Sequence, residues 1–92
     1  MRYEYKPSFD RTFKRLPPDR KKKVTEAISF LIDFFETGKK TKGLGLKNLR
    51  GDFWEIRANI RDRIIFTLID GTVSFIIVGT HDEIRRFLKA IK

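Results

Sequence analysis

Two arginines and a histidine in the second half of the chain, Arg57, Arg63 and His81, could act together on a phosphate group. Guanidinium groups stabilise negative charge on phosphoryl oxygens, and imidazole is the side chain whose unperturbed titration lies near neutrality. The combination suits phosphodiester chemistry if the fold brings all three residues to one place. Whether it does so depends on the strands and the helix that carry them.

The stretch from Leu46 to Phe87 predicts three successive β-strands followed by a short helix. Apolar and polar residues alternate around Trp54–Ala58 and Ile64–Leu68, as they do in half-buried strands. The pair Asp70-Gly71 is typical of a type I′ turn, so the second and third strands should form a tight hairpin in which Leu68 opposes Val73.

Directly opposed residues share a face of a sheet, so this hairpin register assigns every side chain to one of two faces. The predicted core face holds Ile64, Phe66, Leu68, Val73, Phe75 and Ile77. The predicted opposite face holds Arg63, Ile65, Thr67, Ser74, Ile76 and Val78.

The turn through Ile60, Arg61 and Asp62 has no comparable signal, so the apolar pattern must select its register. A three-residue loop with Asn59 opposite Arg63 puts Trp54, Ile56 and Ala58 on the core face. A slip of one residue would instead bury Glu55 and Arg57, and burial of an unpaired charge costs several kcal/mol. The first register therefore predicts that Glu55, Arg57 and Arg63 project from the same face.

Composition limits the class of protein. The 92 residues predict one domain, 1–92, with a single modest core. A net charge of +9 favours a polyanionic partner such as nucleic acid or an acidic protein, and fits a membrane surface less well. The strand-like N-terminus and the lack of a long apolar run predict a cytoplasmic protein, and one histidine without cysteine predicts no metal site and no cofactor.

Two helices should precede the three strands, after a short first strand from Arg2 to Lys6 that ends at Pro7. Ser8 is the predicted N-cap of the first helix, which carries Phe9, Phe13 and Leu16 and stops at Pro17-Pro18. The second helix should run from Pro18 to a left-handed terminator at Gly38. Its apolar stripe, which should pack on the sheet, consists of Val24, Ala27, Ile28, Leu31, Phe34 and Phe35.

Basic residues also gather outside the strands. The run Arg20–Lys23 is interpreted as a solvated turn of the second helix in preference to a phosphate contact. The segment from Gly38 to Arg50 carries Lys42, Lys47 and Arg50 among its cations and has no acidic residue. It could follow a phosphate backbone as a flexible basic loop or be a solvated linker, and the sequence leaves both open.

Thr80 and Glu83 form a capping-box pattern, which explains both residues without any chemistry. His81 is not needed by the cap. A lone histidine at an element boundary is often a bystander, but a helix N-terminus offers amides to a phosphate, and two arginines should stand on the adjoining strands. Arg85, one turn later, could hold a neighbouring phosphate.

The order of these segments resembles the RelE/ParE superfamily of bacterial toxins over nearly the whole chain. The segments that carry the resemblance are Lys47–Gly51, Trp54–Arg57, Arg63–Phe66, Asp70-Gly71 and Val78–Glu83, and Gly79-Thr80-His81 is similar to the motif of the YafQ branch. The resemblance implies an α+β, RelE-like fold of order β-α-α-β-β-β-α, with an antiparallel sheet and the two N-terminal helices packed on one face. It also implies a small antitoxin as partner, which the net charge of +9 predicts to be acidic, and metal-independent cleavage of mRNA in the ribosomal A site.

Carried over by position, the resemblance implies that Arg57, Arg63 and His81 are catalytic. It makes Lys47 and Arg50 a basic lead-in. The chain departs from the pattern in two respects: Ile84, Arg85 and Phe87 stand near the place of a late tyrosine, and Glu55 with Arg57 stands for a pair of lysines. Both changes leave His81 as the residue that would exchange the proton when an RNA 2′-hydroxyl attacks the adjacent phosphate.

Two alternatives remain from the sequence. ParE-type relatives act by binding DNA gyrase and cleave no RNA, and the missing tyrosine favours that alternative, whereas the basic face and His81 oppose it. The other alternative is a catalytically inactive member that binds nucleic acid.

Overall fold

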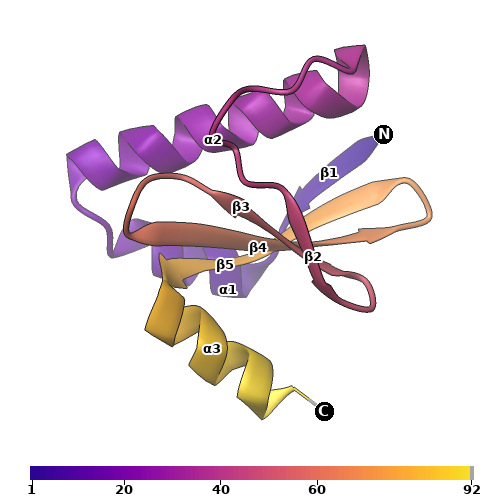
Figure 1. The fold of residues 1–92 in the computed structure, drawn as a ribbon. Coiled ribbons are helices and arrows are strands. Elements are labelled where there is room, and N and C mark those ends of the chain that lie inside the picture. The colour runs from indigo at the N-terminus through magenta and orange to yellow at the C-terminus, as the bar shows by residue number, and fades with distance from the viewer. Residues whose placement is uncertain (92) are drawn as a thin grey trace.

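The computed structural model describes residues 1–91, which form an α+β fold of five strands and three helices (Figure 1). The elements are β1 (Arg2–Tyr5), α1 (Pro7–Lys14), α2 (Pro18–Thr37), β2 (Lys47–Arg50), β3 (Phe53–Arg57), β4 (Asp62–Ile69), β5 (Thr72–Thr80) and α3 (His81–Ala90). No helix in this part of the chain has the length and apolar character needed to cross a membrane.

The strands form one sheet of order β1-β5-β4-β3-β2. Two features differ from the predicted antiparallel sheet: β1 pairs with β5 in parallel, and Lys47–Arg50, predicted as loop, forms the edge strand β2. Four residues with little alternation carry no signal for the direction in which an edge strand is added. β2 was missed because its pattern is mostly polar, and its pairing with β3 comes from backbone hydrogen bonds rather than from an apolar face.

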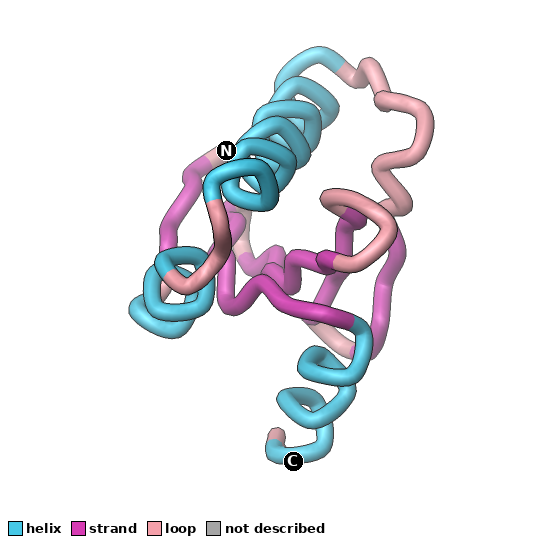
Figure 2. The backbone as a smooth tube through the Cα atoms, turned by 90° about the vertical axis from the view of Figure 1, so that its left-hand side faces the viewer, coloured by secondary structure: helices cyan, strands magenta, loops and turns pink. Residues whose placement is uncertain are grey.

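The sheet separates two apolar clusters of unequal size. Helices α1 and α2 cover one face, as predicted, and α3 lies on the other side (Figure 2). The larger cluster contains Phe9, Leu16, Val24, Ala27, Ile28, Leu31, Leu44, Ile56, Ile64, Phe66, Val73, Phe75 and Val78. On the other face Ile65 and Ile77 pack with Ile84 of α3. Much of this second face is left for polar side chains.

The helix ends follow the predicted signals with one exception. Pro18 opens α2, Gly38 ends it with a φ of 78°, and Thr80 with Glu83 forms a reciprocal capping box at the start of α3. Ser8, however, is not the N-cap of α1, because that helix already begins at Pro7 and its N-cap is Lys6. The Ser8 hydroxyl instead donates a 2.6 Å hydrogen bond to the carbonyl of Ile76 in β5.

The β4–β5 hairpin has the predicted turn but not the predicted register along its whole length. Leu68 opposes Val73, as expected from Asp70-Gly71. Between Ile65 and Phe66 the register shifts, so Ile65 opposes Ile77 rather than Ile76. As a result Ile77 leaves the main core for the α3 face, and Val78, predicted outside, enters the core.

Two side chains of α1 bond backbone groups of β5 beside this bulge, beyond the point where β1 stops pairing with β5. Ser8 donates to the Ile76 carbonyl, and Thr12 Oγ1 accepts a 3.1 Å hydrogen bond from the Val78 amide. A buried amide without a partner costs about 1–3 kcal/mol, so these bonds remove the penalty of an irregular strand. The shift brings Gly79 opposite Arg63, where a regular hairpin would place Val78.

The β3–β4 hairpin is closed by a polar turn. Arg57 opposes Arg63, so the register differs by two residues from the predicted pairing of Asn59 with Arg63. A shift of two residues preserves the faces, and the predicted side of each strand is therefore correct. The Asn59 side-chain oxygen accepts from the amides of Arg61 and Asp62, which is a local interaction that apolar patterning does not reveal.

Asp62 ties this turn to α2. Its carboxylate is fully buried and accepts hydrogen bonds from the Arg20 guanidinium, one of 2.9 Å from Nε, and from the Asn59 amide at 3.0 Å. The hydrogen bonds from Arg20 lower the pKa of Asp62. The prediction that Arg20–Lys23 is a solvated turn is therefore wrong for Arg20, whose guanidinium is paired with the one fully buried carboxylate of residues 1–91.

Replacement of Arg20 by glutamine should lower the free energy of unfolding by about 3–5 kcal/mol, because it leaves a buried carboxylate without its counter-ion. Urea titration at pH 7 measures the change. Lys22→Gln removes a cation from the same helical turn at an exposed position and should change stability by less than about 0.5 kcal/mol. Equal effects of the two substitutions would contradict a specific role for the Arg20 pair.

Urea titration of the unaltered protein and of Arg20→Gln at low pH tests whether the charge of Asp62 causes the difference in stability. The pKa of Asp62 is lower in the folded protein than in the unfolded chain, so the pair stabilises fully above the ordinary aspartate range near pH 4. This contribution is lost as the pH falls through the lowered pKa. The gap in stability between the unaltered protein and Arg20→Gln should therefore narrow steadily below about pH 4.

Candidate phosphate-binding groove

A groove of about 780 Å³ lies on the sheet face that α3 only partly covers. Its walls come from the segment before β2, from β2, β3 and β4, and from α3. The residues that line it are Gly45, Leu46, Lys47, Leu49, Glu55, Arg57, Arg63, His81, Ile84, Arg85 and Leu88. We refer to it as the groove.

The strand register places two arginines side by side in the groove. Arg57 on β3 and Arg63 on β4 are directly opposed, which would be unfavourable for two like charges without a nearby acid. Glu55 supplies that acid: its carboxylate lies 3.8 Å from the Arg63 guanidinium, and both side chains are largely buried. Among residues 1–91, Arg57 makes no ion pair, so its exposed guanidinium is available to a ligand.

The chain before β2 holds the Arg57 backbone in place. The Arg57 amide donates a 2.7 Å hydrogen bond to the Leu44 carbonyl, and the Leu44 side chain is buried in the main core. Gly45 has a φ of 65°, and a Cβ on it would lie 3.3 Å from the Arg57 Cβ. Glycine at this position therefore lets the chain pass close beside Arg57.

His81 is the first residue of α3, and the capping box fixes the direction in which that helix leaves the sheet. The Thr80 amide donates to the Glu83 carboxylate at 2.8 Å, and the Glu83 amide donates to the Thr80 hydroxyl. The first of these bonds lowers the pKa of Glu83. Gly79 permits the close approach, since a Cβ there would lie 2.9 Å from a Glu83 oxygen. The exposed imidazole of His81 then lines the groove.

Five of the basic residues singled out in the sequence line the groove together: Lys47, Arg57, Arg63, His81 and Arg85. Two others lie elsewhere. Lys42 lines a separate hollow of about 160 Å³ between α2 and the loop before β2. Arg50 donates hydrogen bonds to the carbonyls of Leu88 and Ile91, so its guanidinium holds the end of α3. Arg50 is thus engaged in a structural role that its sequence context does not indicate.

Glu55 is the groove residue that sequence reasoning undervalued. The sequence placed it correctly on the face of Arg57 and Arg63, but only as the loss of a positive charge. In the structure it is the carboxylate of the groove, next to Arg63. The available signal was the prediction that Glu55, Arg57 and Arg63 share one face; the direct opposition of the two arginines, which calls for an acid within reach, appears only with the observed register. No cluster of three or more potential metal-ligating carboxylate or imidazole side chains occurs in residues 1–91.

Known structures share this architecture. No family model and no curated protein matches the sequence. A point mutant of YafQ from E. coli superposes with a TM-score of 0.72 at 18% identity, over 91% of this chain and 98% of that chain. RelE in the RelB–RelE antitoxin–toxin complex from Methanococcus jannaschii gives 0.68 at 16% identity, over 91% and 96%. A YoeB/ParE toxin from Agrobacterium tumefaciens gives 0.66 at 16% identity, over 88% and 99%.

At these identities the likeness establishes the fold. The chain therefore has the α+β fold of the RelE/ParE-like toxins, as its segment order predicted. Within that fold, the groove between the sheet and α3 is a site at which charged side chains converge.

The two groove arginines should respond differently to substitution. Arg63→Gln should lower the free energy of unfolding by about 1–3 kcal/mol, because Glu55 would be left largely buried without its partner. Arg57→Gln should change it by less than about 0.5 kcal/mol, because Arg57 is exposed and makes no ion pair within residues 1–91. Chemical denaturation measures both. If Arg57→Gln lowers the free energy of unfolding more than Arg63→Gln does, the assignment of Arg63 as the paired and Arg57 as the unpaired guanidinium is wrong.

Proposed function

We propose that this protein is the toxin of a type II toxin–antitoxin system and that it acts as a metal-independent endoribonuclease on mRNA at the ribosome. The observation that carries the proposal is the convergence of Arg57, Arg63, Glu55 and His81 in one groove. The fold neighbours support the toxin assignment, since two of them are described as toxins and two as complexes of a toxin with an antitoxin. The link to RNA rests on the chemistry of the groove.

Cleavage would begin with attack of an RNA 2′-hydroxyl on the adjacent phosphorus. The new O2′–P bond forms as the P–O5′ bond breaks, which leaves a cyclic phosphate and a 5′-hydroxyl. The guanidinium groups of Arg57 and Arg63 would stabilise the charge that develops on the phosphoryl oxygens. Both lie in the groove, and the like-charge pair gains most from a phosphate placed between them.

Proton transfer in this reaction needs an acceptor for the 2′-hydroxyl and a donor for the leaving oxygen. The groove contains one carboxylate, that of Glu55, and one imidazole, that of His81. We assign the acceptor role to Glu55 and the donor role to His81, because a carboxylate accepts protons and an imidazolium carries one to give. The two come from different elements, β3 and α3, so the reacting phosphate would lie between the sheet and the helix.

An acidic antitoxin would be the natural inhibitor of such a protein. The net charge of +9 favours an acidic partner, and a segment that folds over the groove would mask its arginines. We expect this protein to be neutralised in that way in the cytoplasm.

Replacement of His81 by alanine should reduce mRNA cleavage by about 100- to 10,000-fold, the usual contribution of a general acid or base. His81 is exposed and outside the capping-box bonds, so the variant should stay folded. In vitro translation followed by primer extension detects codon-spaced cuts that depend on ribosomes. Lys22→Ala, at an exposed position of α2 outside the groove, is the control. Full toxicity of His81→Ala would rule out histidine catalysis.

The cleavage assay, combined with a measurement of DNA damage in cells, separates the alternative functions. DNA double-strand damage in cells without RNA cleavage would identify a ParE-like gyrase-binding toxin. Binding of nucleic acid with neither effect would identify an inactive member.

Glu55→Gln should also lower cleavage by at least about 100-fold, because an amide cannot accept the proton. Glutamine has nearly the same size and a polar oxygen that can face Arg63, so the fold should be retained, as a thermal melt can verify. Asp52→Asn is the matched control, since Asp52 is an exposed acid next to β3 and outside the groove. If Glu55→Gln cleaves at the normal rate, the acceptor is another group.

A further inference from the structure

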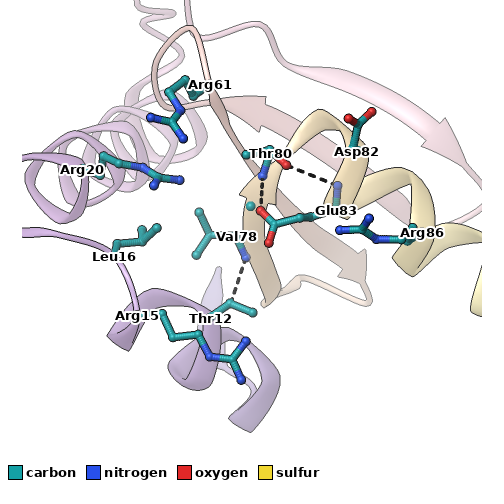
Figure 3. Close-up of a pocket in the computed structure, with 11 residues that line it drawn as sticks. Thr12, Arg15, Leu16, Arg20, Arg61, Val78, Thr80, Asp82, Glu83 and Arg86 are labelled. Carbon is teal, nitrogen blue, oxygen red and sulfur yellow. Dashed lines mark hydrogen bonds between the residues drawn. The ribbon is translucent and has the colours of Figure 1, made fainter.

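A second basic hollow lies on the opposite flank of α3 from the groove. Its volume is about 460 Å³, and it is lined by Thr12, Arg15, Leu16, Arg20, Arg61, Val78, Gly79, Thr80, Asp82, Glu83 and Arg86 (Figure 3). We call it the arginine pocket. It lies where the ends of α1 and β5, the start of α2 and the β3–β4 turn meet the first turns of α3.

The arginines of this pocket come from four different segments. Arg15 follows α1, Arg20 is in α2, Arg61 is in the β3–β4 turn and Arg86 is in α3. Figure 3 shows Arg20 and Arg61 on one side and Arg86 on the other. Guanidinium groups repel one another, so a structure that gathers them from four segments is stabilised when an anion enters.

Some charged side chains of the pocket are paired within the protein and others are not. Arg20 is paired with Asp62, whereas Arg61 and Arg86 make no ion pair within residues 1–91. The Glu83 carboxylate is bonded to the Thr80 amide, and Asp82 points away from Glu83 and Arg86 in Figure 3. Arg15 is likewise exposed and makes no ion pair within residues 1–91, so three exposed guanidinium groups are available in the pocket.

A continuous basic path joins this pocket to the groove. Arg85 lines the groove and Arg86 lines the arginine pocket, and both also line a smaller hollow together with Asp82 and Lys89. Consecutive residues of a helix point about a quarter turn apart, so this pair carries positive charge over the exposed surface of α3. A polyanionic strand could cross the helix from one site to the other.

We infer that the arginine pocket is a second phosphate-binding site, which holds the backbone of the same RNA strand that enters the groove. This inference rests on the proposed function for the strand in the groove. A phosphate suits the pocket better than a peptide carboxylate, because its oxygens can accept from several guanidinium groups that arrive from different directions. The pocket would contribute to affinity and register without taking part in the chemistry.

Binding of a 12-nucleotide single-stranded RNA with 2′-O-methyl riboses tests the inference, because a methylated strand cannot attack its own phosphate. The double variant Arg61→Gln with Arg86→Gln should bind it at least about 10-fold more weakly at low salt. For each phosphate that the variant no longer binds, the slope of log K against log salt should also fall by about 0.7. Fluorescence anisotropy over a salt series gives both values.

The matched control is the double variant Arg2→Gln with Arg11→Gln, which removes the same charge from exposed positions outside both sites. A loss of affinity and slope confined to the Arg61 and Arg86 variant supports the second site. Equal losses in both variants would show a general charge effect and overturn it. If the Arg61 and Arg86 variant does not fold, Arg86→Gln with Arg11→Gln as its control provides the same comparison.

Three further outcomes separate this inference from its rivals. A peptide of twelve glutamates serves as the acidic-protein probe: if the Arg61 and Arg86 variant loses the peptide but binds RNA normally, the pocket is a protein site and the inference fails. Failure of the proposed function looks different, because the unaltered protein would then cut no RNA while the pocket-dependent binding persisted. RNA cleavage with unchanged binding by the Arg61 and Arg86 variant would reject only the second site.

Discussion

The bonds of Asp62 to Arg20 and Asn59 are the interaction on which the geometry of the groove depends. Asp62 is fully buried, and its carboxylate is bound from α2 and from its own turn. The turn fixes the register of β3 against β4, and that register puts Arg57 opposite Arg63. A carboxylate buried without these donors would cost several kcal/mol, so slipped registers that separate it from Arg20 are strongly disfavoured. The Arg20–Asp62 pair therefore stabilises the arrangement of the groove residues, although it lies on the opposite face of the sheet.

The bulge in β5 adjusts the other wall of the groove. It moves Val78 into the core and sets Gly79 opposite Arg63, so α3 begins directly beside the paired strands. The cost of the irregularity is offset by Ser8 and Thr12, which lie one turn apart on α1 and bond backbone groups of β5 beside the bulge. Helix α1 therefore contributes to the position of His81 without touching the groove.

Much of this arrangement could be predicted from local rules, and the failures have identifiable causes. The Asp70-Gly71 turn, the capping box and the faces of Glu55, Arg57 and Arg63 follow from dihedral preferences and alternation, and all are confirmed. The bulge, the bond of Arg50 to the end of α3 and the Arg20–Asp62 pair join segments far apart in the sequence. Such contacts leave no periodic pattern, so Arg20 was interpreted as a solvated cation and Arg50 as part of a basic lead-in to a phosphate site.

The arginines of this protein fall into two groups, those bonded to other groups of the chain and those that are exposed and unpaired. Arg20, Arg50 and Arg63 are bonded to acceptors of the chain, and each fixes an element that borders the groove. Arg57, Arg61 and Arg86 are exposed, and among residues 1–91 they make no ion pair. The guanidinium of Arg20, which makes two hydrogen bonds to a fully buried carboxylate, gains little from a phosphate, whereas an unpaired guanidinium beside other cations gains both a hydrogen-bond acceptor and relief of repulsion. Arg63 lies between these cases, because Glu55 is 3.8 Å from its Nε. A net charge of +9 is therefore a poor guide to ligand sites, and the pairing state of each arginine is a better one.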